Sequence, residues 1–427
     1  MTAALPAPAE QGMPLTRELA RELAHWRLAA ARLGELEAVA PIAAWQRLEH
    51  YLGVSLQLTI RTAVGRLERQ AEQLHSRLKD ARTEEEGARV TAALLEFRRA
   101  YGRVETLVDF YADALATRAA PKLGALLRAC DHIATRGMAE ILAPLGRQVP
   151  AALTYLDSGM GASILKAGLR LWDGSSDNPV SAIKVVRHNL LRCTSVLHEA
   201  GHQVAHMLGW NGDLAAMLRE RLATHSRELG ELYASWASEI AADAFAFAHT
   251  GYASVAALHD VIDGPDAVVF QILPGDPHPV SDVRLMLGVE LCRQAYGAGP
   301  WDALAAAWRL RHPVANAPAA VRGLFEASPT VLPEVAATLL RARFRAFGNA
   351  SLTALVNPAR VSPRELLQLE RQAGAAAYAS PYWMWNESIR LLALTGYRAT
   401  EGAAALRAAT AQQEQWMLRL GALRQAA

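Results

Sequence analysis

The chain has 427 residues, of which 52% are hydrophobic and 20% are charged, and its 44 lysines and arginines nearly balance its 42 acidic residues. This length predicts two or three domains that bury their cores without disulfides, and a net charge of +2 without a basic cluster argues against nucleic acid as a partner. Every apolar run is interrupted before the roughly 20 residues that cross a membrane, so we expect no transmembrane span.

The first part of the chain, residues 1–149, has the pattern of a helical region. It consists almost entirely of helix formers, with apolar residues three and four apart and charged residues between them. Breaks near Pro41, at the charged run 82–86 and at Pro121 predict about four helices, most of them long. We interpret the region as a helical bundle that packs on another part of the protein, and partner binding or oligomerisation through these N-terminal helices is the alternative.

A strand is predicted soon after Pro150. Residues Ser163–Trp172 alternate between apolar and polar side chains, which is the period of a half-buried strand. A helical pattern resumes at about Pro179 and returns beyond Pro300. Four prolines interrupt this last part: Pro313, Pro333, Pro358 and Pro363. The pattern predicts a mainly α protein with a small β-sheet.

The segment Val196–Met207, VLHEAGHQVAHM, contains an HExxH motif. His198 and His202 are four residues apart, so on a helix both imidazoles project from the same face and can bind one zinc ion. Glu199 stands where a carboxylate can reach a zinc-bound water and act as general base. His206 lies one turn further on and cannot easily share that metal with both histidines, so we interpret it as a residue that supports the ligands from behind or lies at the helix end.

A second helical stretch, Trp236–Ala248, supplies the missing acidic groups. Glu239 can be the third metal ligand, and Asp243, four residues later, can accept the second ring N–H of a zinc histidine. A third histidine six residues after His202 is excluded, because that position is Leu208. The plainer alternatives are a solvated helix face for the motif and an ordinary surface acid for Asp243. Burying such polar groups unpaired among apolar residues would be costly, which favours the metal site.

This combination resembles the gluzincin metallopeptidases, most closely those of the HtpX and CAAX-prenyl-protease type, and its ExxAD helix also resembles the ImmA/IrrE-type regulatory peptidases. Their pattern is an apolar strand with a Gly-Leu pair, an HExxH helix, an ExxAD helix and a His-Pro followed by an arginine. The matching pieces are Gly168-Leu169, HEAGH at 198–202, EIAAD at 239–243 and HPVSDVR at 278–284. The resemblance implies a zincin-like zinc peptidase domain at 150–300, flanked by helical regions at 1–149 and 301–427.

By this resemblance and by the chemistry of the residues, we expect a soluble zinc-dependent metallopeptidase that hydrolyses a protein or peptide substrate, with Glu199 as general base. His278 or Arg284 is the candidate donor to the oxyanion. The alternatives for these two are a turn residue before Pro279 and a structural ion-pair partner. The predicted strand Ser163–Trp172 offers an edge along which an extended substrate can pair.

A second hypothesis is a regulatory or binding protein on a metallopeptidase fold, with latent or no proteolysis. Glu199 favours the enzyme, because a structural zinc site needs its ligands but has no use for a base. The three cysteines Cys130, Cys193 and Cys292 are odd in number and far apart. This usage is typical of buried thiols in a reducing compartment, so we expect a cytoplasmic protein.

Overall fold

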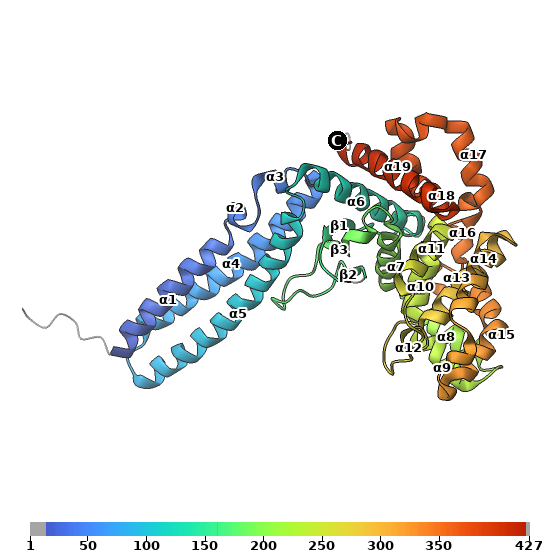
Figure 1. Cartoon of the computed structure of the whole chain (residues 1–427). Helices are drawn as coiled ribbons and strands as arrows, with labels where there is room; N and C mark the ends of the chain where they lie inside the picture. The colour runs from blue at the N-terminus through green and yellow to red at the C-terminus, as the bar shows by residue number, and fades with distance from the viewer. Residues whose placement is uncertain (1–13, 160, 424–427) are drawn as a thin grey trace, which may run out of the picture. The chain divides into compact units, whose positions relative to one another are not determined.

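The computed structural model describes residues 14–159 and 161–423. It shows a mainly helical protein with one small β-sheet, which confirms the predicted secondary-structure content (Figure 1). Among the described residues, no helix combines the length and the apolar content that a membrane span requires. The three cysteines are free and buried, as the cysteine spacing predicted.

The chain divides into two compact units. The first contains the described residues up to Ala119 together with Gly168–Pro179, and the second contains Ala120–Ala167 and the described residues from Val180 onward. The chain therefore leaves the second unit for twelve residues and then returns to it. These two units do not map one to one onto the three regions predicted from the sequence, whose bounds stay a prediction.

The first unit is built on three long helices. They are α1 (Pro14–Leu33), α4 (His50–Asp80) and α5 (Glu84–Ala116), with the short α2 (Leu36–Val39) and α3 (Ile42–Trp45) between α1 and α4. Apolar residues three and four apart on α4, such as Ile60, Val64 and Leu67, are buried where α4 packs against α1 and α5. Thr83 forms a capping box with Glu86 and starts α5 directly after α4 ends. The breaks predicted in this region are confirmed.

The segment Gly168–Pro179 packs on the helices of the first unit. Oδ2 of Asp173 accepts a hydrogen bond from Nη2 of Arg66 on α4 at 2.6 Å. Oδ1 of Asn178 accepts a hydrogen bond from the Tyr111 hydroxyl on α5 at 2.8 Å. These side-chain bonds hold the segment as an irregular loop against the bundle.

The predicted strand Ser163–Trp172 is wrong beyond its first residues. The strand β2 covers only Ser163–Leu165, and Gly168 then turns the chain away with a φ of +81°. Leu171 lies in the loop and is nevertheless buried. The apolar residues of the predicted strand therefore include residues that are buried without being in a strand. The Gly168-Leu169 pair therefore lies outside the strand.

The sheet belongs to the second unit and has three strands. Their order is β1 (Ala151–Leu156), β3 (Val180–Val185) and β2, with β1 parallel and β2 antiparallel to β3. The helical pattern predicted from Pro179 is wrong over β3, and β1 was not predicted. Both strands are almost entirely buried, and a short buried apolar run does not distinguish a strand from a helix. Because the strand order is β1-β3-β2, β2 forms one edge of the sheet.

Helices pack on this sheet and on one another. The helix α6 (Pro121–Leu142) contacts β1, and α7 (Thr194–Leu208) contacts β3 and packs closely along α10 (Ala237–Thr250) (Figure 1). Gly201 makes this closeness possible, because an added Cβ would lie 2.9 Å from Cβ of Phe245 and 3.0 Å from Cα of Ala242. The two helices with the predicted metal ligands therefore lie side by side.

The rest of the second unit is helical. The remaining α-helices are α8 (Trp210–Leu222), α9 (Arg227–Ser235), α11 (Tyr252–Ile262), α12 (Asp266–Val269), α13 (Ser281–Tyr296), α14 (Pro300–Arg311), α15 (Ala319–Arg341), α16 (Leu352–Leu355), α17 (Pro363–Ala373), α18 (Pro381–Arg398) and α19 (Ala403–Ala422). Short 3₁₀ turns separate several of them. The break predicted at Pro333 is wrong, because this proline lies inside α15. The helix also contains Pro329, and residues between and beside the two prolines, such as Val331 and Val335, are buried.

Candidate metal centre

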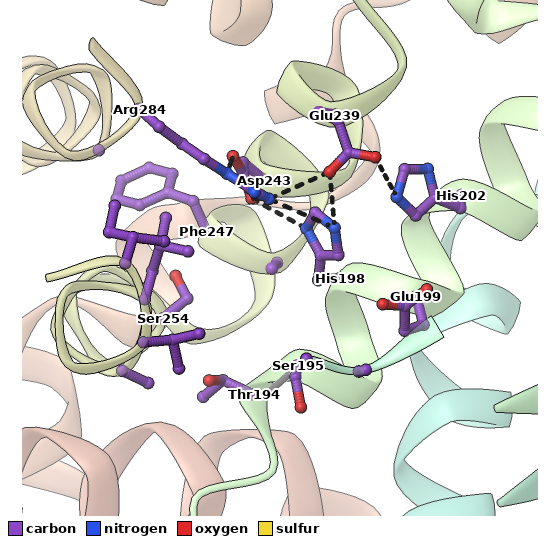
Figure 2. A pocket seen from close by; sticks show the side chains of 18 of the residues that line it. Thr194, Ser195, His198, Glu199, His202, Glu239, Asp243, Phe247, Ser254 and Arg284 are labelled. Carbon is purple, nitrogen blue, oxygen red and sulfur yellow. Dashed lines mark hydrogen bonds and ion pairs between the residues drawn. The ribbon is translucent and has the colours of Figure 1, made fainter. Parts of the chain in front are cut away.

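Two neighbouring helices bring the three predicted ligands together. His198 and His202 lie one turn apart on α7, and Glu239 lies in the first turn of α10. Nε2 of His198 is 3.3 Å from Oε2 of Glu239, and Nε2 of His202 is 3.1 Å from Oε1 of Glu239 (Figure 2). The three ligand atoms all lie within 4.8 Å of one another, so this group could hold a metal ion.

A charged network orients the imidazole of His198. Its Nδ1 lies 2.9 Å from Oδ1 of Asp243, which is one turn beyond Glu239 on α10. Arg284, in the first turn of α13, donates two hydrogen bonds to Asp243, from Nε at 2.6 Å and from Nη2 at 2.8 Å. Nη2 of Arg284 also lies 3.2 Å from Oε2 of Glu239 and 3.4 Å from Nε2 of His198. One guanidinium therefore faces two carboxylates, so Asp243 and Glu239 share the single positive charge of Arg284.

Neutral side chains orient His202. Its Nδ1 lies 3.3 Å from Oγ of Ser238, and the same hydroxyl oxygen accepts a hydrogen bond from Nδ2 of Asn211 at 3.2 Å. Without a metal, Nε2 of His202 donates to Glu239; with a metal at Nε2, the proton would lie on Nδ1 and Ser238 would accept it in a hydrogen bond. The two histidines therefore present the same nitrogen to the same carboxylate.

These contacts shift the pKa values of the cluster in opposite directions. Burial raises the pKa of Glu239, but hydrogen bonds from both histidines outweigh burial and hold this pKa well below its ordinary value. Burial lowers the pKa of His198, but the adjacent carboxylate of Asp243 raises it to about 10. Burial raises the pKa of Asp243, but the charges of Arg284 and His198 and their hydrogen bonds together lower it to about 2. A metal ion would displace the proton that His198 otherwise holds.

Glu199 is a buried carboxylate on the wall of the same cavity. Its exposed fraction is 5%, and burial raises its pKa although the nearby His198 and His202 oppose the shift. The described residues provide no hydrogen bond to this carboxylate. Glu199 is thus available to accept a proton.

His278 lies at the rim of the centre, in the loop between α12 and α13. Its Nδ1 is 2.6 Å from Oδ1 of Asp276, which also accepts a hydrogen bond from the backbone N–H of His278 at 2.9 Å. Its Nε2 lies 3.7 Å from Oε2 of Glu239, and its side chain is 56% exposed. Asp276 therefore holds the ring with Nε2 close to the metal ligands.

All seven predicted site residues line one cavity of about 620 Å³ in the second unit. One end of the cavity is polar and contains the histidines and carboxylates. The other end is lined by apolar side chains of α10, α11 and α13. These are Phe247, Val255, Leu258, Val261, Leu287 and Leu291. Figure 2 shows Phe247 on the opposite side of His198 from His202. His206 is exposed in the last turn of α7 and does not line the cavity.

Three supporting side chains were missed by the sequence analysis. Ser238 and Asn211 hold His202, and Asp276 holds His278. The position of Asp276, two residues before His278, is the spacing of a local aspartate turn and offered a signal. Nothing in the sequence relates Asn211 to the metal site, because the contact depends on how α8 packs beside α10.

Comparison with known proteins gives no match that would identify the site. No family model matches the chain, and neither a curated protein nor a solved structure matches it. The proposals below therefore depend on the geometry and chemistry of the residues.

Proposed function

We propose that the protein is a zinc-dependent metallopeptidase of the gluzincin type, with a zincin-like second unit, that hydrolyses peptide bonds. The observation that carries this proposal is the buried carboxylate of Glu199 beside a cluster of three metal-ligating side chains. A regulatory or binding protein with a structural metal would need the ligands and would have no use for such a base. Peptide hydrolysis by a zinc enzyme uses both the ligands and the base.

The donor set suits zinc in spacing and in chemistry. Zinc bonds of about 2.0–2.1 Å in tetrahedral geometry place neighbouring ligand atoms about 3.3 Å apart. Nε2 of His198 lies 3.3 Å from Oε2 of Glu239, Nε2 of His202 lies 3.1 Å from Oε1, and the three ligand atoms lie within 4.8 Å of one another, which supports a single shared ion. Two histidines and one carboxylate leave a fourth position for water, which is the arrangement of hydrolytic zinc.

In the proposed reaction, Glu199 moves the proton. When bound, zinc would supply a Lewis acid for the scissile carbonyl and would lower the pKa of a water molecule. Glu199 accepts the proton of the attacking water and passes it to the leaving amine. The raised pKa of Glu199 suits this transfer, because a base works best when its pKa lies near the operating pH.

His278 is the proposed donor to the oxyanion. Asp276 accepts a hydrogen bond from its Nδ1, so in the imidazolium form Nε2–H stays near the ligands and can donate to an oxygen that becomes negative in the transition state. Arg284 has a different proposed role, because its guanidinium is committed to Asp243 by two hydrogen bonds. It holds Asp243 and, through Asp243, the ring of His198.

The cavity also indicates which substrates fit. The apolar wall of α10, α11 and α13 offers space for an apolar side chain next to the cleaved bond. Ser163 and Ile164 of β2 line the same cavity, and β2 is an edge strand. An extended peptide with an apolar residue near the cleaved bond is therefore the proposed substrate.

The test combines metal analysis with a peptide-library cleavage assay read by mass spectrometry. We expect stoichiometric zinc and cleavage for the unaltered protein. Glu199→Gln should keep zinc and fold but lose at least about 100-fold in cleavage, because it removes the base and leaves the ligands. Equal cleavage by Glu199→Gln and the unaltered protein would refute the proposal.

His202→Ala is the matched control for this experiment. It removes a ligand one turn from Glu199 on the same helix, so both zinc and cleavage should be lost. Circular dichroism of both variants checks that α7 remains folded. Together the two variants separate loss of the base from loss of the metal.

A further inference from the structure

The start of α7 places two hydroxyl groups on the wall of the cavity, one turn before the metal ligands. Thr194 is four residues before His198, so the two lie on the same face of the helix. Ser195 is related to Glu199 in the same way. Figure 2 shows both hydroxyl residues on the opposite side of His198 from Glu239. One helical turn is about 5.4 Å, which is shorter than two residues of an extended chain.

Both hydroxyls are buried without a partner among the described residues. Thr194 is only 6% exposed, yet no group within residues 14–159 and 161–423 forms a hydrogen bond with its hydroxyl. The oxygen of Ser195 is buried and is unpaired in the same part of the chain. Leaving a buried hydroxyl unpaired costs free energy, and most such groups have a partner. The pair therefore indicates a ligand that forms hydrogen bonds.

Arg192 brings a positive charge to the same wall. It lines the cavity two residues before α7, and its carbonyl accepts a hydrogen bond from the Thr194 N–H at 2.8 Å. Its Nη1 forms an ion pair with Oδ2 of Asp260 on α11, which orients the guanidinium. Among the described residues, this is the only hydrogen bond of a group that has five N–H donors. Arg192 therefore has donors left for a ligand.

We propose that Arg192, Thr194 and Ser195 form a subsite for a carboxylate of the substrate, one turn of α7 from the candidate metal centre. A carboxylate accepts several hydrogen bonds and pairs with a guanidinium, and the N-terminus of a helix favours negative charge. The carboxylate can be the C-terminus of a peptide or the side chain of an aspartate or glutamate near the cleaved bond. This inference rests on the proposed peptidase function and adds an anionic group to its substrate class.

The test uses four versions of one hexapeptide of alternating alanine and leucine, labelled with fluorescein at its amino terminus. Two versions end in a free carboxylate or in an amide, and the other two are amides with a central glutamate or a central glutamine. If the C-terminus occupies the subsite, kcat/KM for the free acid should exceed that for the amide by about 10- to 100-fold. If a side chain occupies it, glutamate should exceed glutamine by a similar factor. Cleavage with no difference in either pair would refute the subsite and leave the peptidase proposal standing.

Two variants of Arg192 test the charge. Arg192→Met keeps a chain of similar length without the cation, so the preference for the carboxylate should fall to within two-fold. Arg192→Lys should keep part of the preference, because the charge remains but the forked donors are lost. Zinc content and circular dichroism check that both variants are folded. A preference that survives unchanged in Arg192→Met would overturn the proposal.

A binding measurement is independent of turnover. Fluorescence anisotropy with the Glu199→Gln protein should show the same preference among the four peptides. Adding Thr194→Val should weaken binding of the favoured peptide about five-fold without lowering the free energy of unfolding, because the change removes a hydroxyl that has no partner in the free protein. Equal binding of all four peptides would refute the subsite. If the preference appears in binding and is lost in Arg192→Met while no peptide is cleaved, the peptidase proposal fails and the subsite stands.

Discussion

The two histidines of the candidate metal centre present the same nitrogen to Glu239 but are held by different chemistry. Nδ1 of His198 faces the carboxylate of Asp243, which is paired with the guanidinium of Arg284. Nδ1 of His202 faces the hydroxyl of Ser238. The first arrangement is a chain of buried charges, and the second contains only neutral groups. Orientation of an imidazole therefore does not require the buried ion pair.

We call Asp243 and Arg284 beside His198 the charged side, and Ser238 beside His202 the neutral side. The difference between them indicates what the charged side adds. A hydroxyl fixes the ring and its tautomer at small electrostatic cost. A carboxylate also increases the basicity of the ring, so it strengthens the binding of a metal and of a proton alike. Arg284 then becomes necessary, because without it the carboxylates of Asp243 and Glu239 would be buried with less compensation. We expect perturbations of the His198 side to be large and dependent on pH.

The largest effect is expected for Arg284→Leu. This change leaves two buried carboxylates without their guanidinium partner, so the metal-free protein should lose about 3 kcal/mol in free energy of unfolding. The measurement is urea denaturation of the chelator-treated protein at neutral pH. Zinc should recover part of the loss, because a cation bound between the same groups replaces some of the missing positive charge.

Arg284→Lys is the matched control for charge. It keeps a cation but cannot form the two-pronged bond to Asp243, so its stability should lie between those of Arg284→Leu and the unaltered protein. A metal-free Arg284→Leu protein within 1 kcal/mol of the unaltered stability would show that the charged side is not held by this pair.

The next effect is expected for Asp243→Asn and should depend on pH. Asp243 raises the pKa of His198 to about 10, so below that pH a proton competes with the metal for the ring. Asp243→Asn weakens the binding of both the proton and the metal ion to His198. Zinc affinity should therefore fall about 10- to 100-fold near pH 10 and by less at neutral and acidic pH. Competition titration with a chromophoric chelator measures this, and a loss that stays constant with pH would contradict it.

The smallest effect is expected for Ser238→Ala on the neutral side. The variant removes one oxygen and leaves all charges in place, so zinc affinity should fall about ten-fold at most and the stability of the metal-free protein should change by about 1 kcal/mol or less. The same chelator titration and urea denaturation measure both quantities. If Ser238→Ala weakened zinc more than Asp243→Asn does near pH 10, the contrast between the two sides would be lost.

The contrast between these sides also shows how far the sequence could lead. His198, His202, Glu239 and Asp243 follow helical spacing, and both helices form where the apolar periodicity predicts them. Ser238 was next to a predicted ligand, yet no spacing rule marks a serine as a partner of a histidine on another helix. The same limit applied to the strands, because buried runs such as Val180–Val185 have no polar face to reveal their period.

By itself, the sequence determined which side chains share a helical face, because a residue and the one four positions later always project from the same side of a helix. That rule was sufficient for the HExxH pair and for the Glu239–Asp243 pair. Only the tertiary structure decided that these two faces meet, through the close contact at Gly201, and that Gly168–Pro179 leaves the sheet for the helical unit. Contacts between segments distant in sequence depend on packing, and local periodicity carries no information about the partner.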